Sequence, residues 1–64
     1  MLKEELLKEI ERCRELKKLY DEIPTGGFGS VMINMAIKKG ENAIIKNDAI
    51  EMLVAVKELK EIEG

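Results

Sequence analysis

A glycine-rich segment near the middle of this 64-residue chain reads Ile-Pro-Thr-Gly-Gly-Phe-Gly-Ser. Its glycines, Gly26, Gly27 and Gly29, permit positive φ and the close approach of a ligand to the backbone. Thr25 and Ser30 add hydroxyl donors. If a helix follows, its first N–H groups and the positive end of its dipole favour an anion. The segment therefore predicts an anion site, although its spacing matches neither the P-loop nor the dinucleotide-binding fingerprint.

The distribution of charge points to the same segment. The chain has 13 acidic residues, but none lies within residues 23–40, where Lys38 and Lys39 are the only charged residues. A positive region in a chain of net charge −2 concentrates ligands of opposite sign. Lys17 and Tyr20 lie within two helical turns before the segment. Lysines, glycine N–H groups and an aromatic ring are together suited to a nucleotide, because they offer donors to its phosphates and a stacking surface to its base.

A purely structural interpretation of the segment stays open. A glycine-rich connection is often only a turn, and Phe28 is then a core residue. Lys38 is then a solvated surface charge. Asp21 and Glu22, at the end of the preceding helix, are placed to occupy the start of the next helix themselves and so cancel an anion site.

Catalysis and metal binding are not expected. The chain has no His, which is the commonest general base, and its single Cys13 has no His to activate it. Cys13 is instead expected to be a small buried hydrophobic residue. Carboxylates are interleaved with Lys and Arg along helix faces, so no cluster stands out as a metal site. The sequence predicts a protein that is not an enzyme and has no cofactor.

The elements that position the glycine-rich segment are helices. Residues 2–22 are rich in Leu, Glu, Lys and Arg, and their apolar residues recur at spacings of three and four, which predicts a first helix. Pro24 ends it, because the residue before a proline avoids the helical region. Residues 23–29 are then expected to form the loop, and Ser30 to cap a second helix over residues 30–46.

A third helix is expected to form a hairpin with the second. Asp48 followed by Glu51 matches a capping box, with Asp in place of Ser or Thr, that opens a helix over residues 48–63. Gly40 lies inside the second helix, and a glycine there indicates either a close contact with another helix or a break. Whether the third helix packs in its own chain or against a neighbour's is left open.

The fold class predicted is all-α: a three-helix chain with a helical hairpin, one domain over residues 1–64. A domain of this size buries only about 60% of the surface that its unfolded chain exposes, yet hydrophobic residues make up 45% of this one. Residues 49–56 are apolar on nearly every side of the third helix, which is more than one short chain can cover. We therefore expect a homo-oligomeric helical bundle.

Composition also limits the partners and the location. The net charge of −2 disfavours duplex nucleic acid, which calls for a basic face. No signal peptide or membrane span is visible, so we expect no membrane partner and a cytoplasmic location.

The segment at residues 23–29, with the later run Asn-Ala-Ile-Ile-Lys-Asn-Asp at residues 42–48, resembles small phage proteins. More distantly, it is similar to the helical-hairpin family of phage anti-defence sponges, which sequester cyclic nucleotide or cyclic ADP-ribose immune signals without cleaving them. The resemblance covers about residues 20–48. That family tends to have a Met-Trp pair where this chain has Lys39-Gly40, and it tends to end before the third helix.

The resemblance implies a homo-oligomer with phosphate-binding pockets shared between protomers. By position, it assigns the phosphate contacts to Thr25, Gly26, Gly27, Gly29 and Ser30. It assigns the stacking on a base to Tyr20 or Phe28, and the positive charge to Lys17 or Lys38. The first hypothesis is therefore non-enzymatic sequestration of a cyclic nucleotide or related phosphorylated signal by a counter-defence sponge in the host cytoplasm. The alternative is a small oligomeric helical protein-interaction module with no small-molecule ligand.

Overall fold

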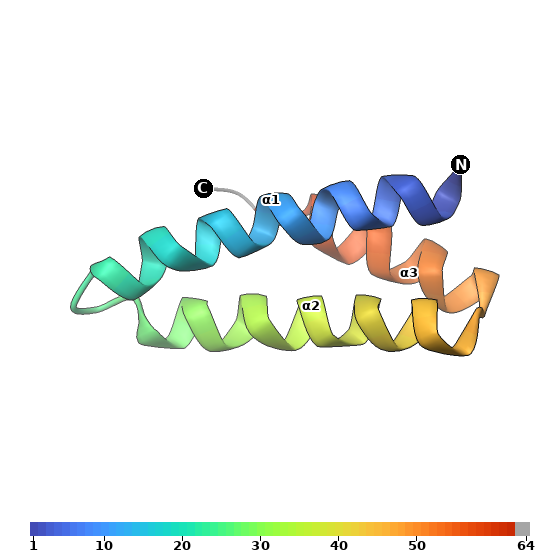
Figure 1. The fold of residues 1–64 in the computed structure, drawn as a ribbon. Coiled ribbons are helices and arrows are strands. Elements are labelled where there is room, and N and C mark those ends of the chain that lie inside the picture. Colours follow the sequence, from blue (N-terminus) through green and yellow to red (C-terminus); the bar gives the residue numbers. More distant parts are fainter. Residues whose placement is uncertain (63–64) are drawn as a thin grey trace.

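A computed structural model of the chain describes residues 1–62. They form three α-helices, α1 (Leu2–Glu22), α2 (Gly27–Lys46) and α3 (Ala49–Lys60), and contain no strand. The helices α1 and α2 lie side by side in opposite directions along most of the molecule, and α3 folds back against both of them in the half that holds the N-terminus (Figure 1). The prediction of an all-α three-helix chain is confirmed.

The core lies between the three helices and comes from one apolar stripe on each. Spacings of three and four residues place the stripe on a single face of its helix. Cys13 is fully buried in this core, and burial raises the pKa of its thiol. The buried apolar side chains are Leu6, Ile10 and Cys13 of α1, Ile33, Ile37 and Ala43 of α2, and Met52, Ala55, Val56 and Leu59 of α3.

A polar contact fastens the end of α3 to α1. The guanidinium group of Arg12 donates to the carbonyl oxygens of Leu59, at 2.6 Å, and Ile62, at 3.0 Å. Carbonyl groups in the last turn of a helix lack intrahelical donors, so a cation placed there also interacts favourably with the helix dipole. In this structure, α3 therefore packs against α1 and α2 of its own chain.

Gly40 marks a helix contact and not a break. The helix α2 is continuous through it, and Gly40 is buried. A Cβ atom at this position would lie 3.3 Å from the Cδ1 atoms of both Leu6 and Ile10. The missing side chain thus lets α1 approach α2 closely at this point of the core.

The helix α2 begins three residues earlier than the predicted start at Ser30. Its N-cap is Gly26, whose carbonyl oxygen accepts the N–H of Ser30 at 3.0 Å. Gly27, Phe28 and Gly29 are helical, so the predicted loop over residues 23–29 shortens to residues 23–26. The reason is conformational: among the described residues no glycine has positive φ, so these glycines adopt backbone angles that a helix accepts.

The turn between α2 and α3 agrees closely with the prediction from the sequence. Asn47 adopts the left-handed conformation, with φ 54° and ψ 41°, and ends α2. The side chain of Asp48 accepts from the backbone N–H groups of Ile50, at 3.0 Å, and Glu51, at 3.1 Å, which confirms the predicted cap. Glu51 does not complete a reciprocal box, since the N–H of Asp48 donates to the carbonyl oxygen of Ala43 at 3.2 Å, and the Glu51 carboxylate instead pairs with Lys46 at 3.6 Å. The described helix ends at Lys60, and residue 63 of the predicted range lies outside the described residues.

Candidate functional site

The connection between α1 and α2 is short and held by backbone hydrogen bonds. Ile23 ends α1 in an extended conformation, as expected for a residue before proline, and its N–H bonds the carbonyl oxygen of Tyr20 at 3.1 Å. The N–H of Gly26 bonds the carbonyl oxygen of Ile23 at 2.9 Å. Pro24 and Thr25 lie exposed at the tip. Of the hydroxyls predicted to bind phosphate, that of Thr25 is therefore open to solvent.

Close contacts with Tyr20 account for the lack of a side chain at two of the three glycines in this segment. A Cβ atom at Gly26 would lie 2.3 Å from the Tyr20 carbonyl oxygen, and one at Gly29 would lie 2.5 Å and 2.6 Å from the Tyr20 ring atoms Cδ2 and Cε2. Neither position accepts a side chain unless its surroundings move. At Gly27, by contrast, a Cβ atom would meet nothing within 4 Å. Gly26 and Gly29 thus have a packing function whether or not a ligand binds.

The Asp21 carboxylate of α1 already binds two of the predicted phosphate donors. Ser30 is only 6% exposed, and its hydroxyl donates to Oδ1 of Asp21. The ammonium group of Lys17 lies 3.1 Å from Oδ2 of the same residue. The Ser30 hydrogen bond, and then Lys17, lower the pKa of Asp21 below the ordinary range of an aspartate. Asp21 is therefore ionised at neutral pH and already uses two of the groups predicted to contact a phosphate.

The remaining predicted site residues are spread over the surface. Phe28 is 80% exposed, so it is not a core residue. Tyr20 is half-buried against Gly29 and lines a groove of about 410 Å³. Lys38 is exposed on α2, eight residues beyond Ser30, which is about 12 Å along a helix. The structure brings Tyr20, Ser30 and Lys17 together around the end of α1, but it does not bring Lys38 to them.

The positive charge of this region is partly neutralised by α3. Residues 23–40 contain no acidic residue, but Lys39 forms a 3.0 Å ion pair with Glu58 across the α2–α3 interface. Together with Asp21, Glu58 lowers the positive electrostatic potential that an anion would experience near α2.

An exposed apolar stripe on α2 is the feature that the sequence analysis missed. It consists of Phe28, Val31, Met32 and Met35, which are 80%, 57%, 54% and 63% exposed. Spacings of three and four residues put the four side chains on one face of the helix. That face is opposite the buried residues Ile33 and Ile37. We call it the outer α2 stripe. The spacing of these residues is visible in the sequence, but the prediction placed Phe28 in the loop and so did not count it as part of a helix face.

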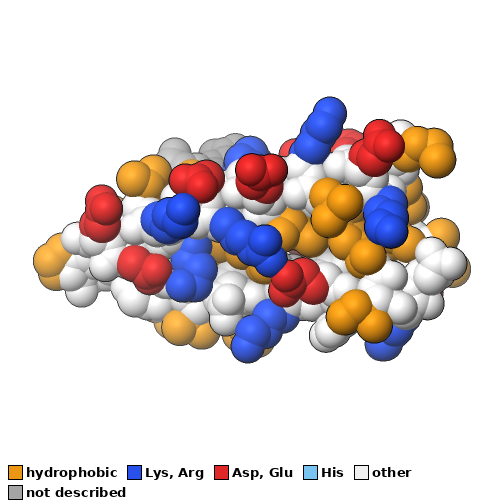
Figure 2. All heavy atoms as spheres, in the orientation of Figure 1, with side chains coloured by type: hydrophobic (Ala, Val, Ile, Leu, Met, Phe, Trp, Pro, Cys, Tyr) orange, Lys and Arg blue, Asp and Glu red, His pale blue; other side chains and the backbone are white. Residues whose placement is uncertain are grey.

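Two further apolar surfaces are exposed. One is the outer face of α3, formed by Ile50, Leu53 and Val54. The other is a groove of about 670 Å³ between α1 and α2, with exposed Leu7 and Ile45 among its lining residues. Figure 2 shows hydrophobic side chains gathered between these two helices, towards the N-terminal end.

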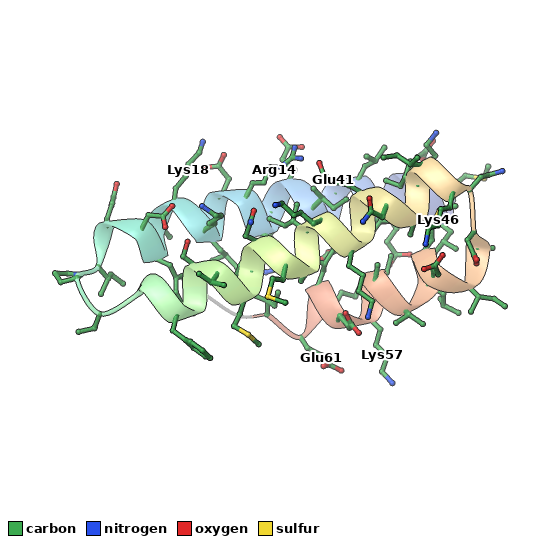
Figure 3. The ribbon with its side chains drawn as sticks, turned by 90° about the horizontal axis from the view of Figure 1, so that it is seen from below. Arg14, Lys18, Glu41, Lys46, Lys57 and Glu61 are labelled. Carbon is green, nitrogen blue, oxygen red and sulfur yellow. The ribbon has the colours of Figure 1, made fainter. Side chains whose placement is uncertain are left out.

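Charged side chains border the groove between α1 and α2. Arg14 of α1 and Glu41 of α2 form an ion pair across it, and Figure 3 shows the two side chains next to each other. Glu11, Glu15 and Lys18 lie along the same groove. Its apolar surface is therefore divided by charge, unlike the outer α2 stripe.

The described residues contain no group of three or more His, Cys, Asp or Glu side chains placed to hold a metal ion. Within the same part of the chain, every helix is too short or too polar to cross a membrane. Comparison with protein-family models, with curated proteins and with solved structures found no match to this chain.

Proposed function

We propose that this chain is a helical protein-interaction module that works through its exposed apolar helix faces and assembles with other copies of itself. The observation that carries the proposal is the outer α2 stripe, where four large apolar side chains in an unbroken row are each more than half exposed. The largest contiguous apolar patch on a monomeric protein, about 300–600 Å², is often functional, and larger patches mark interaction sites.

The size of the chain supports the same proposal. A three-helix chain of 64 residues has a small core relative to its surface, so burying further apolar area between chains stabilises it considerably. The apolar surfaces on α2, on α3 and between α1 and α2 face different directions, so contact with one partner leaves the others available. These features favour an assembly of several chains or of this chain with another protein.

Sedimentation equilibrium over a wide range of protein concentration tests the proposal. We expect the average mass to rise above that of one 7.3 kDa chain as concentration increases. A Gly27→Asp variant is the matched control, because it changes the loop end of α2 without touching an apolar face, and its Cβ atom has open space. It should associate like the parent. A single-chain mass at every concentration would contradict self-association.

Sequestration of a cyclic nucleotide or related phosphorylated signal, and a counter-defence role with it, is a second candidate. One observation favours it: exposed Thr25, Gly27 and Phe28 surround the first turn of α2, so backbone N–H groups, a hydroxyl and an aromatic ring are accessible side by side. Asp21 weakens this candidate, because its negative charge lies at the same helix end.

Native mass spectrometry with a panel of cyclic dinucleotides, cyclic trinucleotides and ADP-ribose derivatives tests the second candidate. Uptake of whole ligand masses, recovered intact after denaturation, would support sequestration. Gly27→Asp should then abolish uptake, because it adds a negative charge at the helix end, whereas Gly27→Ala should retain it. No uptake from the panel would leave the protein-interaction module as the better-supported function.

A further inference from the structure

We infer that the partner of the outer α2 stripe is the same stripe of a second copy, packed antiparallel about a two-fold axis between Val31 and Met32. This inference rests on the proposed function, which states only that apolar faces associate. Among the described residues, no helix covers the side of α2 that faces away from α1 (Figure 1). Each side chain of the stripe is more than half exposed, although Met32 also lines the groove beside Tyr20 and Glu58, so the stripe is open to contact with another helix.

The exposed area fits a weak, reversible dimer. Taking about 150–200 Å² for one fully exposed side chain of this size, the four residues leave on the order of 450 Å² of apolar surface on each copy. Two copies would bury on the order of 900 Å² through these side chains, and flanking atoms bring the total towards the roughly 1,200 Å² at which stable, specific interfaces begin. A dimer that dissociates on dilution is the expected result.

The positions of the charged residues on α2 favour an antiparallel arrangement of the two copies. The stripe contains no charged residue, and the nearest charges on α2, Lys38 and Lys39, lie only beyond its C-terminal end. A parallel pair in register would place these lysines against the same lysines of the second copy. An antiparallel pair separates the two sets to opposite ends of the interface, where like charges no longer oppose each other.

Side-chain shape agrees with this arrangement. With the axis between Val31 and Met32, the ring of Phe28 faces Met35 of the second copy, and the contact occurs twice by symmetry. A flexible thioether packs well against an aromatic ring. The two other residues face each other at the centre, where each helix presents one branched and one flexible side chain.

The other two apolar surfaces suit a second copy less well. On α3, the exposed row has only three residues, Ile50, Leu53 and Val54, which are 76%, 61% and 41% exposed, so it offers less apolar area than the outer α2 stripe. In the groove between α1 and α2, the Arg14–Glu41 ion pair crosses the apolar surface. A second copy docked in this groove would have to desolvate the ion pair, which is costly.

Three lysine substitutions test which face dimerises. Met32→Lys puts a charge at the centre of the proposed interface, and Val31→Lys is a second variant in the same row. Leu53→Lys makes the same change on the exposed face of α3 and is the matched control. In sedimentation experiments we expect both stripe variants to raise the dimer dissociation constant at least about tenfold, and the control to leave it unchanged. Circular dichroism checks that each variant stays helical.

The outcomes separate the inference from the proposed function. If the parent self-associates but both stripe variants associate equally well, the inference is overturned and the proposed function stands. If Leu53→Lys alone prevents association, the interface is on α3 and the inference is again wrong. If the parent is a single chain at every concentration, self-association fails altogether.

The orientation has its own measurement. In a Cys13→Ala background, a spin label attached after Lys38→Cys reports the distance between the two copies. An antiparallel pair separates the labelled positions by about 20 Å along the helix axes, whereas a parallel pair leaves about 10 Å, the spacing of the axes alone. A distance near the shorter value would overturn the antiparallel arrangement.

Discussion

Two Gly→Ala substitutions in the first turn of α2 should have opposite effects on stability. Gly27 and Gly29 are both helical and neither has positive φ, so alanine suits the backbone at both positions. Their surroundings differ, because a Cβ atom at Gly27 meets nothing within 4 Å and one at Gly29 lies 2.5 Å from the ring of Tyr20. The comparison therefore isolates the contact between Tyr20 and α2.

The magnitudes follow from two opposing effects. Replacing a helical glycine by alanine stabilises a helix by roughly 0.5–1 kcal/mol, and the gain at Gly27, at the helix end, should lie near the lower value. At Gly29 the same gain is opposed by overpacking, which costs about 1–3 kcal/mol where a ring cannot move freely. We expect Gly27→Ala to stabilise the protein, Gly29→Ala to destabilise it, and the two to differ by about 2 kcal/mol.

Thermal unfolding followed by circular dichroism at one fixed protein concentration measures the difference, since association makes the midpoint concentration-dependent. In a domain of this size, a difference of about 2 kcal/mol corresponds to roughly 10 °C in Tm. A Tyr20→Ala background supplies the decisive control: with the ring removed, Gly29→Ala should stabilise. If Gly29→Ala matches Gly27→Ala in the parent chain, the Tyr20–Gly29 contact does not exist in solution.

Substitutions at three further positions test the polar contacts that hold the helices. Arg12→Met keeps the aliphatic stem but removes the donors to the end of α3, and should lower the free energy of unfolding by about 1 kcal/mol in urea titrations. Asp48→Ala removes the N-cap of α3 and should lower the free energy of unfolding, measured by thermal unfolding, by about 1 kcal/mol. Asp48→Ser should retain most of this stability, because serine also caps helices. The folded-state pKa of Asp21 is lowered, so its contribution to stability is present above the unfolded pKa of about 3.9 and is lost as pH falls through the folded value. Ser30→Ala should raise the pKa of Asp21 in an NMR titration and shift acid unfolding to higher pH; an unchanged pKa would show that the hydroxyl does not bond the carboxylate.

Most of the fold was predictable because local signals and packing agree. The apolar stripes of all three helices were visible as spacings of three and four, and the stop at Pro24 and the cap at Asp48 rest on short-range backbone chemistry. Gly40 could not be decided from the sequence, since a break and a close contact require the same residue. Only the position of α1, with Leu6 and Ile10 above the glycine, decides it.

The candidate site was predictable only in part, because its chemistry depends on contacts between helices. Nothing in the spacing of Tyr20 and Gly29 shows that the ring lies against the glycine. Likewise, the hydrogen bond between Asp21 and Ser30 joins two helices across the turn, and it changes a predicted phosphate donor into an internal contact. A glycine can serve either a ligand or a neighbouring side chain, and the sequence alone does not separate these uses.

Phe28 is the residue at which the competing interpretations differ most, and Phe28→Ala separates them. A core phenylalanine would cost about 3–5 kcal/mol on truncation, but a side chain that is 80% exposed should cost less than about 0.5 kcal/mol in the single chain. If the ring stacks on a base, the variant should lose nucleotide uptake in native mass spectrometry and keep its self-association. If the ring packs against Met35 of a second copy, the variant should instead raise the dimer dissociation constant, and the midpoint of unfolding should fall only at concentrations where the parent is dimeric. A variant with unchanged association would contradict the packing of Phe28 in the interface, because the most exposed side chain of the stripe cannot lie in the contact without contributing to it.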